Sequence, residues 1–342
     1  MKIFITGGAG FIGSNFTRYC LSKGERVFVY DALTYAGHKE SLPEDRNLIF
    51  EQGDICNYDK VKRCLETFVP KVVINFAAET HVDRSLSGLK QAFEFMRTNH
   101  NGVLVLAQVC NELGIYLHQV STDEIFGEIG ASGLSFMEDS PYKPNNPYAV
   151  SKAAGEMGLL SFARSNPKLR WTISNCTDNY GPYQSPEKVI PRFISKVLNN
   201  EKVPLYTNEK GEAGTNIRDW IYVIDHCEAL YKIITSGIYK EKFCISSGEE
   251  LTNLELTKKL LLLMGKKNWM EWILKVKDRP GHDFRYSLSA SKTYAVLGWR
   301  AKTKIHKGLK ATIGWYKKEG RGWLDKMIEY SGDVRDEQSK SI

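Results

Sequence analysis

Two short groups of residues in this sequence are able to carry acid–base chemistry. The stretch 121–124 (STDE) places Asp123 and Glu124 directly after a threonine, and Tyr148 and Lys152 follow about one helix further on. Residues four apart share one face of a helix, so the phenol and the ammonium would lie together. An ammonium favours the charged form of a nearby acid, and we therefore expect Lys152 to lower the pKa of Tyr148 and make its phenol a usable general base. An acidic pair beside such a phenol predicts proton transfers at several carbons of one substrate.

The spacing of Tyr148 and Lys152 is not decisive by itself. Asp123 and Glu124 could also cap a helix, and Tyr148 could be an ordinary residue of an amphipathic helix. The elements that surround these residues decide between the two interpretations.

A glycine-rich turn near the N-terminus predicts a dinucleotide site. Residues 2–6 form a short apolar run, residues 11–23 have helical periodicity, and Gly7, Gly10 and Gly13 mark the turn between them. In such a turn the first glycine allows a tight bend, the second lets a pyrophosphate approach the backbone, and the third lets the helix pack closely on the strand. The N–H groups at the helix N-terminus then face the phosphates.

Asp31 indicates which dinucleotide binds. It ends a second apolar run at 26–30, about 20 residues past the glycine turn, where the acidic residue of this type of site lies. A carboxylate there accepts hydrogen bonds from ribose hydroxyls and repels a 2′-phosphate. The sequence therefore predicts NAD rather than NADP.

Apolar runs alternate with helical patterns through the first half of the chain. Further strands are predicted at 48–51, 71–76 and 115–120, and helices at 91–113 and from Tyr148 onward. This alternation predicts an α/β fold with a Rossmann-type doubly wound parallel sheet. The strand that ends before residue 121 would deliver the acidic pair to the sheet edge where open α/β folds bind ligands.

From residue 181 the sequence is richer in polar and turn-forming residues, which predicts a smaller, discontinuous substrate-binding lobe. Its loops carry Lys188, Arg218 and Arg279 as candidate clamps for a diphosphate, a group to which arginine makes bidentate contacts. Each of the three could equally be a surface charge. The predicted division is an NAD-binding domain at 1–180 joined by about 217–240, a substrate-binding lobe at 181–216 and 241–330, and a polar tail at 331–342.

The composition limits the class of protein. The 342 residues are 42% hydrophobic and 25% charged, with a formal charge of +7, which is ordinary for a globular enzyme. The seven cysteines are scattered, which predicts reduced thiols in a cytoplasmic protein with no disulfide framework and no metal site. No stretch approaches the length of a membrane span and no nucleic-acid motif accompanies the basic charge, so we expect neither kind of partner.

Several motifs of this sequence occur together in one known family. The glycine turn, Tyr148 with Lys152, and STDEIFG at 121–127 resemble the extended short-chain dehydrogenase/reductases and, within them, the nucleotide-sugar 4,6-dehydratases, including the dTDP-glucose 4,6-dehydratases. Simple epimerases of that superfamily lack the acidic pair. The resemblance extends to about Lys318. Further matching stretches are DALTYAGH (31–38), AAETHVDRS (77–85), NYGPYQSPEK (179–188), IRDW (217–220) and DRPGHDFRY (278–286).

The resemblance implies a reaction and a role for each catalytic residue. NAD would oxidise C4 of a nucleotide-linked hexose, water would leave across C5–C6, and the hydride would return to C6, so that NAD is regenerated and stays bound. Tyr148, assisted by Lys152, would accept the C4 hydroxyl proton while Thr122 hydrogen-bonds the same oxygen. Glu124 would remove the C5 proton while Asp123 protonates the leaving C6 hydroxyl.

The resemblance also implies which residues surround the ligands. Members of the family pair as homodimers through long helices, here the predicted helices at 91–113 and 148–163. The implied cofactor-binding residues are Gly7, Gly10, Phe11, Ile12, Gly13, Asp31, Thr34, Asp54, Ile55, Ala77, Ala78, Thr98, Tyr148, Lys152 and Asn179. The implied substrate-binding residues are Thr80, Thr122, Asp178, Lys188, Val189, Pro204, Tyr206, Arg218, Asn253, Arg279 and His282.

Departures from the family pattern gather on the substrate side. Asp178 stands where the family usually has Asn, Ser185 replaces an aromatic residue, Glu249 stands where Asn is frequent, and the polar loop at 206–216 is longer than usual. The leading substrate is therefore dTDP-glucose on resemblance alone. UDP-N-acetylglucosamine or UDP-glucose, with possible inversion at C5, remains an alternative, and a nucleotide-hexose 4-epimerase is a further one.

Overall fold

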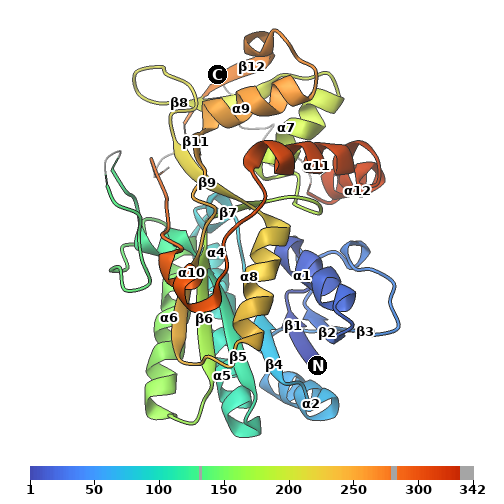
Figure 1. Cartoon of the computed structure of the whole chain (residues 1–342), viewed down its shortest axis with the longest axis vertical. Helices are drawn as coiled ribbons and strands as arrows, with labels where there is room; N and C mark the ends of the chain where they lie inside the picture. Colours follow the sequence, from blue (N-terminus) through green and yellow to red (C-terminus); the bar gives the residue numbers. More distant parts are fainter. Residues whose placement is uncertain (131–132, 279–282, 332–342) are drawn as a thin grey trace.

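A seven-stranded parallel sheet forms the larger lobe of the protein. The computed structural model describes residues 1–130, 133–278 and 283–331. The strand order is β10-β6-β5-β4-β1-β2-β3, and the direction of the connections reverses between β1 and β4 (Figure 1). Every pair in this sheet is parallel. The strands are β1 (Lys2–Thr6), β2 (Arg26–Asp31), β3 (Leu48–Gln52), β4 (Val72–Asn75), β5 (Tyr116–Thr122), β6 (Trp171–Cys176) and β10 (Glu241–Ile245).

Helices cover both faces of the sheet, which is why the central strands are apolar on both sides. On one face, α1 (Phe11–Ser22) and α8 (Val223–Thr235) form a core with the strands around Phe16, Leu230 and Trp299. On the other face, a second core gathers around Leu65, Leu106 and Leu159. Its helices are α2 (Tyr58–Phe68), α5 (Gly102–Leu113) and α6 (Pro147–Ser165).

The helix predicted at 91–113 is not one regular helix, so that prediction was wrong in detail. α4 (Leu89–Met96) passes through a π-helical turn, η2 (Arg97–Asn101), before α5 begins. Within η2, the Asn99 amide bonds the backbone N–H and C=O of Glu79 at 2.8 and 2.9 Å and the Ser151 hydroxyl at 2.8 Å. A Cβ on Gly155 of α6 would lie 2.2 Å from the Asn99 carbonyl oxygen. The π turn thus lets Asn99 tie α6 to the segment that follows β4.

The smaller lobe has its own hydrophobic core and two small sheets. Figure 1 shows it beyond the carboxyl ends of the large sheet's central strands. One sheet contains β7 (Asp178–Tyr180), β9 (Ile217–Tyr222) and β11 (Glu250–Thr252), and the other pairs β8 (Val203–Thr207) with β12 (Ile273–Lys277). The helices of this lobe are α7 (Val189–Leu198), α9 (Asn253–Leu263), α11 (Ile305–Lys317) and α12 (Arg321–Ser331).

The chain crosses between the lobes more often than the predicted division has it. β10, which follows residue 240, pairs in parallel with β6 and forms an edge of the large sheet. Thr293 of α10 (Ser291–Leu297) then bonds the Cys244 carbonyl at 2.6 Å, and Trp299 enters the core beneath α8. Segments of 241–301 therefore return to the larger lobe because they bury apolar side chains there.

The polar loop predicted at 206–216 is shorter in the structure. Residues up to Thr207 belong to β8, and a turn follows in which Asn208 N–H donates to the Glu212 carbonyl at 2.9 Å. The turn is exposed, as predicted for a polar loop.

Among the helices that the structure describes, none is both long and apolar enough to cross a membrane.

Candidate active site

A deep cleft opens at the carboxyl ends of the central strands, beside the point where the strand order reverses. Its cavity has a volume of about 340 Å³. Thr122, Asp123, Glu124, Tyr148 and Lys152 all line it, as does every residue predicted to bind the cofactor. Residues from the predicted substrate set that also line it are Thr80, Asp178 and Lys188.

The acidic pair is held by the end of β5. Thr122 is the last residue of the strand and caps the short turn η3 (Asp123–Phe126), with Glu124 N–H donating to its hydroxyl at 3.4 Å. The Thr122 hydroxyl in turn donates to Asp123 Oδ1 at 3.2 Å. The other carboxyl oxygen of Asp123 is buried and has no hydrogen-bond partner within the described part of the chain. Asp123 Oδ2 is therefore free to carry a proton inside the cleft.

Burial decides the protonation of the acidic pair. It raises the pKa of Asp123 well above its usual range, and the charges of Asp178 and Glu124 raise it further. Burial also raises the pKa of Glu124, again with Asp178 adding to the effect, while a hydrogen bond from Asn146 opposes it. Asn146 Nδ2 lies 3.3 Å from Glu124 Oε2. The structure thus favours a neutral Asp123 that can give up a proton.

Helix α6 presents the phenol and the ammonium to the same cleft. Its N-cap is Asn146, whose side chain accepts from Ala149 N–H at 2.8 Å, and Pro147 occupies the first turn. Tyr148, the residue after Pro147, lies beside the Thr122 hydroxyl, which lowers the pKa of its phenol. The Tyr148 ring also packs edge-on against Phe95, with 6.2 Å between ring centroids. The helix therefore brings Tyr148 against the end of β5.

The expected effect of Lys152 on Tyr148 was wrong for the protein alone. Burial raises the pKa of Tyr148 well above its usual value, and the charge of Glu124 adds to the rise. The Lys152 ammonium donates to the Val120 carbonyl at 2.9 Å, and burial lowers its own pKa to about 8. A buried ammonium bound to a carbonyl does not offset the desolvation of a phenol surrounded by carboxylates. The i, i+4 spacing alone could not reveal this.

The glycine turn leaves no room for a side chain at Gly7 or at Gly13. Gly7 has φ +65°, and a Cβ there would lie 2.4 Å from the backbone nitrogen of Ala77. A Cβ on Gly13 would lie 2.2 Å from the Gly7 carbonyl oxygen. The bend at Gly7 and the close packing at Gly13 match the roles predicted for them, while Gly10 borders the cavity. These residues fit bound NAD.

Asp31 holds the glycine turn and the segment after β2 together. Its carboxylate accepts from Ala9 N–H and from Leu33 N–H, both at 2.8 Å. Burial raises the pKa of Asp31 and these two hydrogen bonds lower it. The carboxylate therefore joins the glycine turn to the 31–38 segment, and Asp31 lines the cavity.

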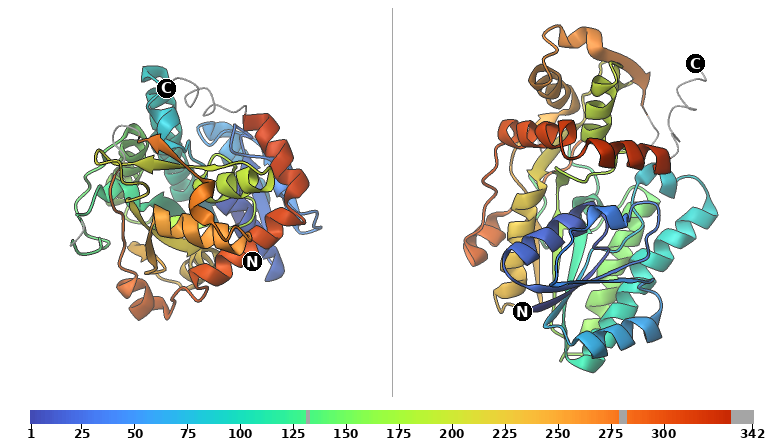
Figure 2. Two further views of the ribbon diagram at one scale, coloured as in Figure 1. Left: turned by 90° about the horizontal axis from the view of Figure 1, so that it is seen from above. Right: turned by 90° about the vertical axis from the view of Figure 1, so that its right-hand side faces the viewer.

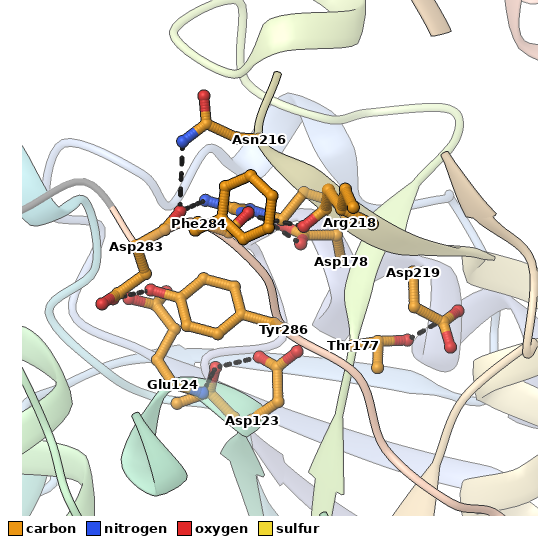
Figure 3. A network of polar contacts seen from close by, with 12 residues as sticks. Asp123, Glu124, Thr177, Asp178, Asn216, Arg218, Asp219, Asp283, Phe284 and Tyr286 are labelled. Atoms are coloured by element: carbon orange, nitrogen blue, oxygen red, sulfur yellow. Dashed lines mark hydrogen bonds and ion pairs between the residues drawn. The ribbon is translucent and has the colours of Figure 1, made fainter. Parts of the chain in front are cut away.

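A network of charged and polar side chains lies beside the acidic pair (Figure 3). Arg218 Nε lies 3.8 Å from Asp178 Oδ2, and its guanidinium also donates to the Asp283 carbonyl at 2.8 Å. The Tyr286 ring packs against this guanidinium at 4.5 Å, and its hydroxyl donates to the Asp283 carboxylate. Glu124 lies close enough for its charge to raise the pKa of Tyr286. Arg218 thus connects Asp178, which lies near the acidic pair, with the backbone of Asp283.

Several predicted substrate-binding residues do not line the main cavity. Arg218 makes the backbone contacts just described, Val189 and Asn253 begin α7 and α9, and Pro204 and Tyr206 belong to β8. Their contact with substrate stays a prediction. Two further predicted residues, Arg279 and His282, lie outside the described residues.

The structure adds lining residues that sequence reasoning missed. They come from the 36–41 segment, from the loop after β7 and from α12: Gly37, His38, Ser41, Tyr183, Gln184 and Trp323. His38, Tyr183 and Gln184 fall within motifs that resemble the family, so their position could have been found. Trp323 lies beyond the resemblance, and no signal in the sequence marked it.

Comparisons with known proteins agree with this geometry. The model of the family described as GDP-mannose 4,6 dehydratase matches residues 4–312. A probable dTDP-glucose 4,6-dehydratase of Sinorhizobium fredii is 40% identical, over 97% of this chain and 98% of that relative. A dTDP-glucose 4,6-dehydratase of Streptomyces venezuelae, solved with NAD and TYD bound, is 39% identical with a TM-score of 0.88, covering 96% of this chain and 100% of that one. Another from Bacillus anthracis, in complex with NAD, is 35% identical with a TM-score of 0.86, covering 96% and 99%.

Proposed function

This chain belongs to the GDP-mannose 4,6 dehydratase family, and we propose that it is an NAD-dependent hydro-lyase that converts dTDP-glucose to its 4-keto-6-deoxy form. The observation that carries this proposal is that two pairs of reactive residues line one cleft. Asp123 and Glu124 face the same cavity as Tyr148 and Lys152, next to a glycine turn that fits NAD. An oxidoreductase site alone would need only the phenol and the ammonium. The acidic pair supplies the proton transfers that a loss of water requires.

The first step is the oxidation at C4 of the sugar. Bound NAD supplies a positively charged nicotinamide ring that takes a hydride from C4 and later returns it to C6. Tyr148 accepts the proton of the C4 hydroxyl, and Thr122, which lies beside that phenol, hydrogen-bonds the C4 oxygen. A positive charge near Tyr148 lowers its pKa, which opposes the effect of burial. Lys152, held by the Val120 carbonyl, adds to this charge while it is protonated.

The second step is the loss of water across C5–C6. The 4-ketone makes the C5 proton acidic, and Glu124 removes it. Asp123 protonates the leaving C6 hydroxyl, for which its raised pKa and its unpaired buried oxygen are suited. Hydride return to C6 and proton return to C5 complete the reaction. Asp178 keeps Asp123 protonated by adding a negative charge nearby.

The identity of the sugar depends on the residues that depart from the family pattern. Asp178 lines the cavity and pairs with Arg218. Glu249 does not line the cavity and accepts from Ile305 N–H at 2.6 Å. Glu249 is thereby explained as a structural residue of the smaller lobe. Asp178 and Ser185 remain at the cavity, where a polar wall could also hold the amide of UDP-N-acetylglucosamine. That sugar is the second candidate, and the 4-epimerase alternative leaves the acidic pair without a role.

A panel of substrates tests the proposal. The purified protein is incubated with dTDP-glucose, UDP-glucose and UDP-N-acetylglucosamine in deuterated water, and each product is followed by proton NMR. We expect dTDP-glucose to lose one water and to gain deuterium at C5 with retained configuration. Turnover of only the acetamido sugar would transfer the proposal to the second candidate. Interconversion at C4 without water loss would contradict a dehydratase.

We also propose a cytoplasmic homodimer. The exposed side chains of Leu89, Phe93, Val150 and Met157 lie on α4 and α6, which pack against each other. An apolar row on two adjacent helices fits a second copy of the same surface. This supports the expectation that two copies pair through the helices predicted at 91–113 and 148–163. The seven cysteines are free, which suits a reducing compartment. Sedimentation of wild type and Phe93→Glu tests the dimer, since the charge should dissociate it.

A further inference from the structure

Four chain segments meet at one rim of the cleft around an arginine. Arg18, on α1, donates to the Ser41 carbonyl and to the Tyr183 hydroxyl, both at 2.7 Å. Its guanidinium also lies 4.2 Å from the centre of the Tyr183 ring. Trp323, on α12, donates its indole N–H to the Ser41 hydroxyl at 3.1 Å. Residues separated by 305 positions in the sequence therefore share one hydrogen-bonded cluster, which we call the aromatic rim (Arg18, Ser41, Tyr183, Trp323).

The aromatic rim borders the part of the cavity that fits NAD. Ser41, Tyr183 and Trp323 line the same cavity as Gly10 and the acidic pair. The segment before Ser41 is tied to the glycine turn, because His38 N–H donates to the Ala9 carbonyl at 3.1 Å. Figure 2 shows α12 lying across the larger lobe above α1. The last described helix of the smaller lobe thus adds a wall to the site built on the first helix of the larger lobe.

The position of Trp323 is held by further rings. Its ring centroid lies 5.8 Å from that of Tyr183 and 5.9 Å from that of Trp315, both at steep interplanar angles. Trp315 lies 4.5 Å from Tyr183. Edge-to-face contacts of this kind are favourable beyond the burial of their area. The indole is therefore held in place by α11 and by the loop after β7, so it forms a fixed wall.

We propose that the aromatic rim is a cofactor-retaining element, in which Trp323 and Ser41 close the NAD site and slow release of the dinucleotide. This inference rests on the proposed function, since a hydride that is taken and then returned requires NAD to stay bound between the two steps. A fixed indole that joins α12 to the 36–41 segment would have to separate from Ser41 before that segment could open. The residues act on the binding of NAD and take no part in proton transfer.

The test measures how fast NAD leaves the protein. Wild type, Trp323→Ala, Trp323→Phe and Ser41→Ala are purified, the NAD bound to each chain is quantified, and release is followed with an excess of an NAD-hydrolysing enzyme as a trap. We expect release about 10-fold faster for Trp323→Ala, which corresponds to about 1.4 kcal/mol. Trp323→Phe keeps a ring but loses the N–H, and Ser41→Ala loses the acceptor, so both should release NAD a few-fold faster.

A matched control separates this effect from general damage. Trp272 lies in the smaller lobe, partly buried beneath the Lys266 ammonium at 3.4 Å, and does not line the main cavity. Trp272→Ala should release NAD as wild type does. Release within twofold of wild type in Trp323→Ala would overturn the proposal, and if that variant does not fold, the same result in Trp323→Phe and Ser41→Ala would overturn it. A wild type that neither retains nor takes up NAD would instead contradict the proposed function.

Discussion

Replacing the acidic pair by its amides should separate the two halves of the reaction. In the double variant Asp123→Asn/Glu124→Gln, the phenol, the ammonium and the glycine turn are unchanged, so oxidation at C4 should proceed. Loss of water should stop, because neither the C5 proton nor the C6 hydroxyl has a partner for proton transfer. The protein should then hold an oxidised sugar and a reduced cofactor that cannot give its hydride back.

The size of the effect follows from the two roles. A positioned acid or base contributes typically 10²–10⁴-fold to a rate, or about 3–5 kcal/mol of barrier. The two groups act on one elimination, so their losses do not simply add, and we expect product release to fall by at least about 10³-fold. The formation of reduced cofactor should change by less than about 10-fold.

The loss should not come from unfolding. Burial and neighbouring negative charges raise the pKa of Asp123, and burial raises that of Glu124. A carboxyl whose folded pKa is raised contributes stability that is fully present below its unfolded pKa and is lost as the pH rises through its folded pKa. The amides of Asn and Gln do not ionise, so the double variant does not lose stability in this way as the pH rises. At neutral pH the double variant should therefore be at least as stable as wild type towards urea.

The assay follows the near-ultraviolet absorbance of reduced cofactor after mixing holoprotein with substrate, with product measured in parallel. The double variant should show a stoichiometric rise that persists, whereas Tyr148→Phe should show no rise. Glu209→Gln, on the exposed turn after β8, is the control and should behave as wild type. Product release by the double variant at near the wild-type rate would refute the roles of Asp123 and Glu124.

Three further predictions concern the cofactor, the ammonium and the fold. Asp31→Ala should narrow the preference for NAD over NADP, measured as the ratio of dissociation constants of the apoprotein; a wild type that binds both equally would contradict the role of Asp31. Burial lowers the pKa of Lys152 to about 8, so the ammonium is lost as the pH rises through that value. C4 oxidation should slow above about pH 8, and Lys152→Arg, which stays charged, should lack this limb; a limb that persists would assign it to another group. Burial lowers the pKa of His118 from 6.5 to about 3, so its contribution to stability is present above pH 6.5 and is lost as the pH falls. Denaturation at pH 7 and pH 5 should show a loss of stability that is about 2 kcal/mol smaller in His118→Gln than in wild type, where the buried His226 adds a loss of its own that both proteins share. Equal losses in the two proteins would count against this explanation.

Much of the fold and of the site was predictable from the sequence, because local patterns determine local structure. Gly7 and Gly13 stand where any Cβ would collide with the backbone, so the turn could be found from residue types alone. Alternating apolar runs and helical periods gave the parallel sheet, since strands buried on both faces must be apolar. The acidic pair directly follows β5, where the carboxyl edge of the sheet places it in the cleft.

Other features depend on neighbours that lie far apart in the sequence, and only the tertiary structure decided them. The pKa of Tyr148 is raised because folding buries the phenol near Glu124, and Lys152 is turned to the Val120 carbonyl, so the i, i+4 spacing pointed in the wrong direction. The π turn at Asn99 exists where Glu79 and Ser151 approach it. The sequence by itself determined the turn, the sheet and the reacting residue types. Desolvation, charge–charge distance and contacts such as that of Trp323 with Ser41 arise only when distant segments pack together, so the protonation of the acids and the closing wall of the cleft were decided by the tertiary structure.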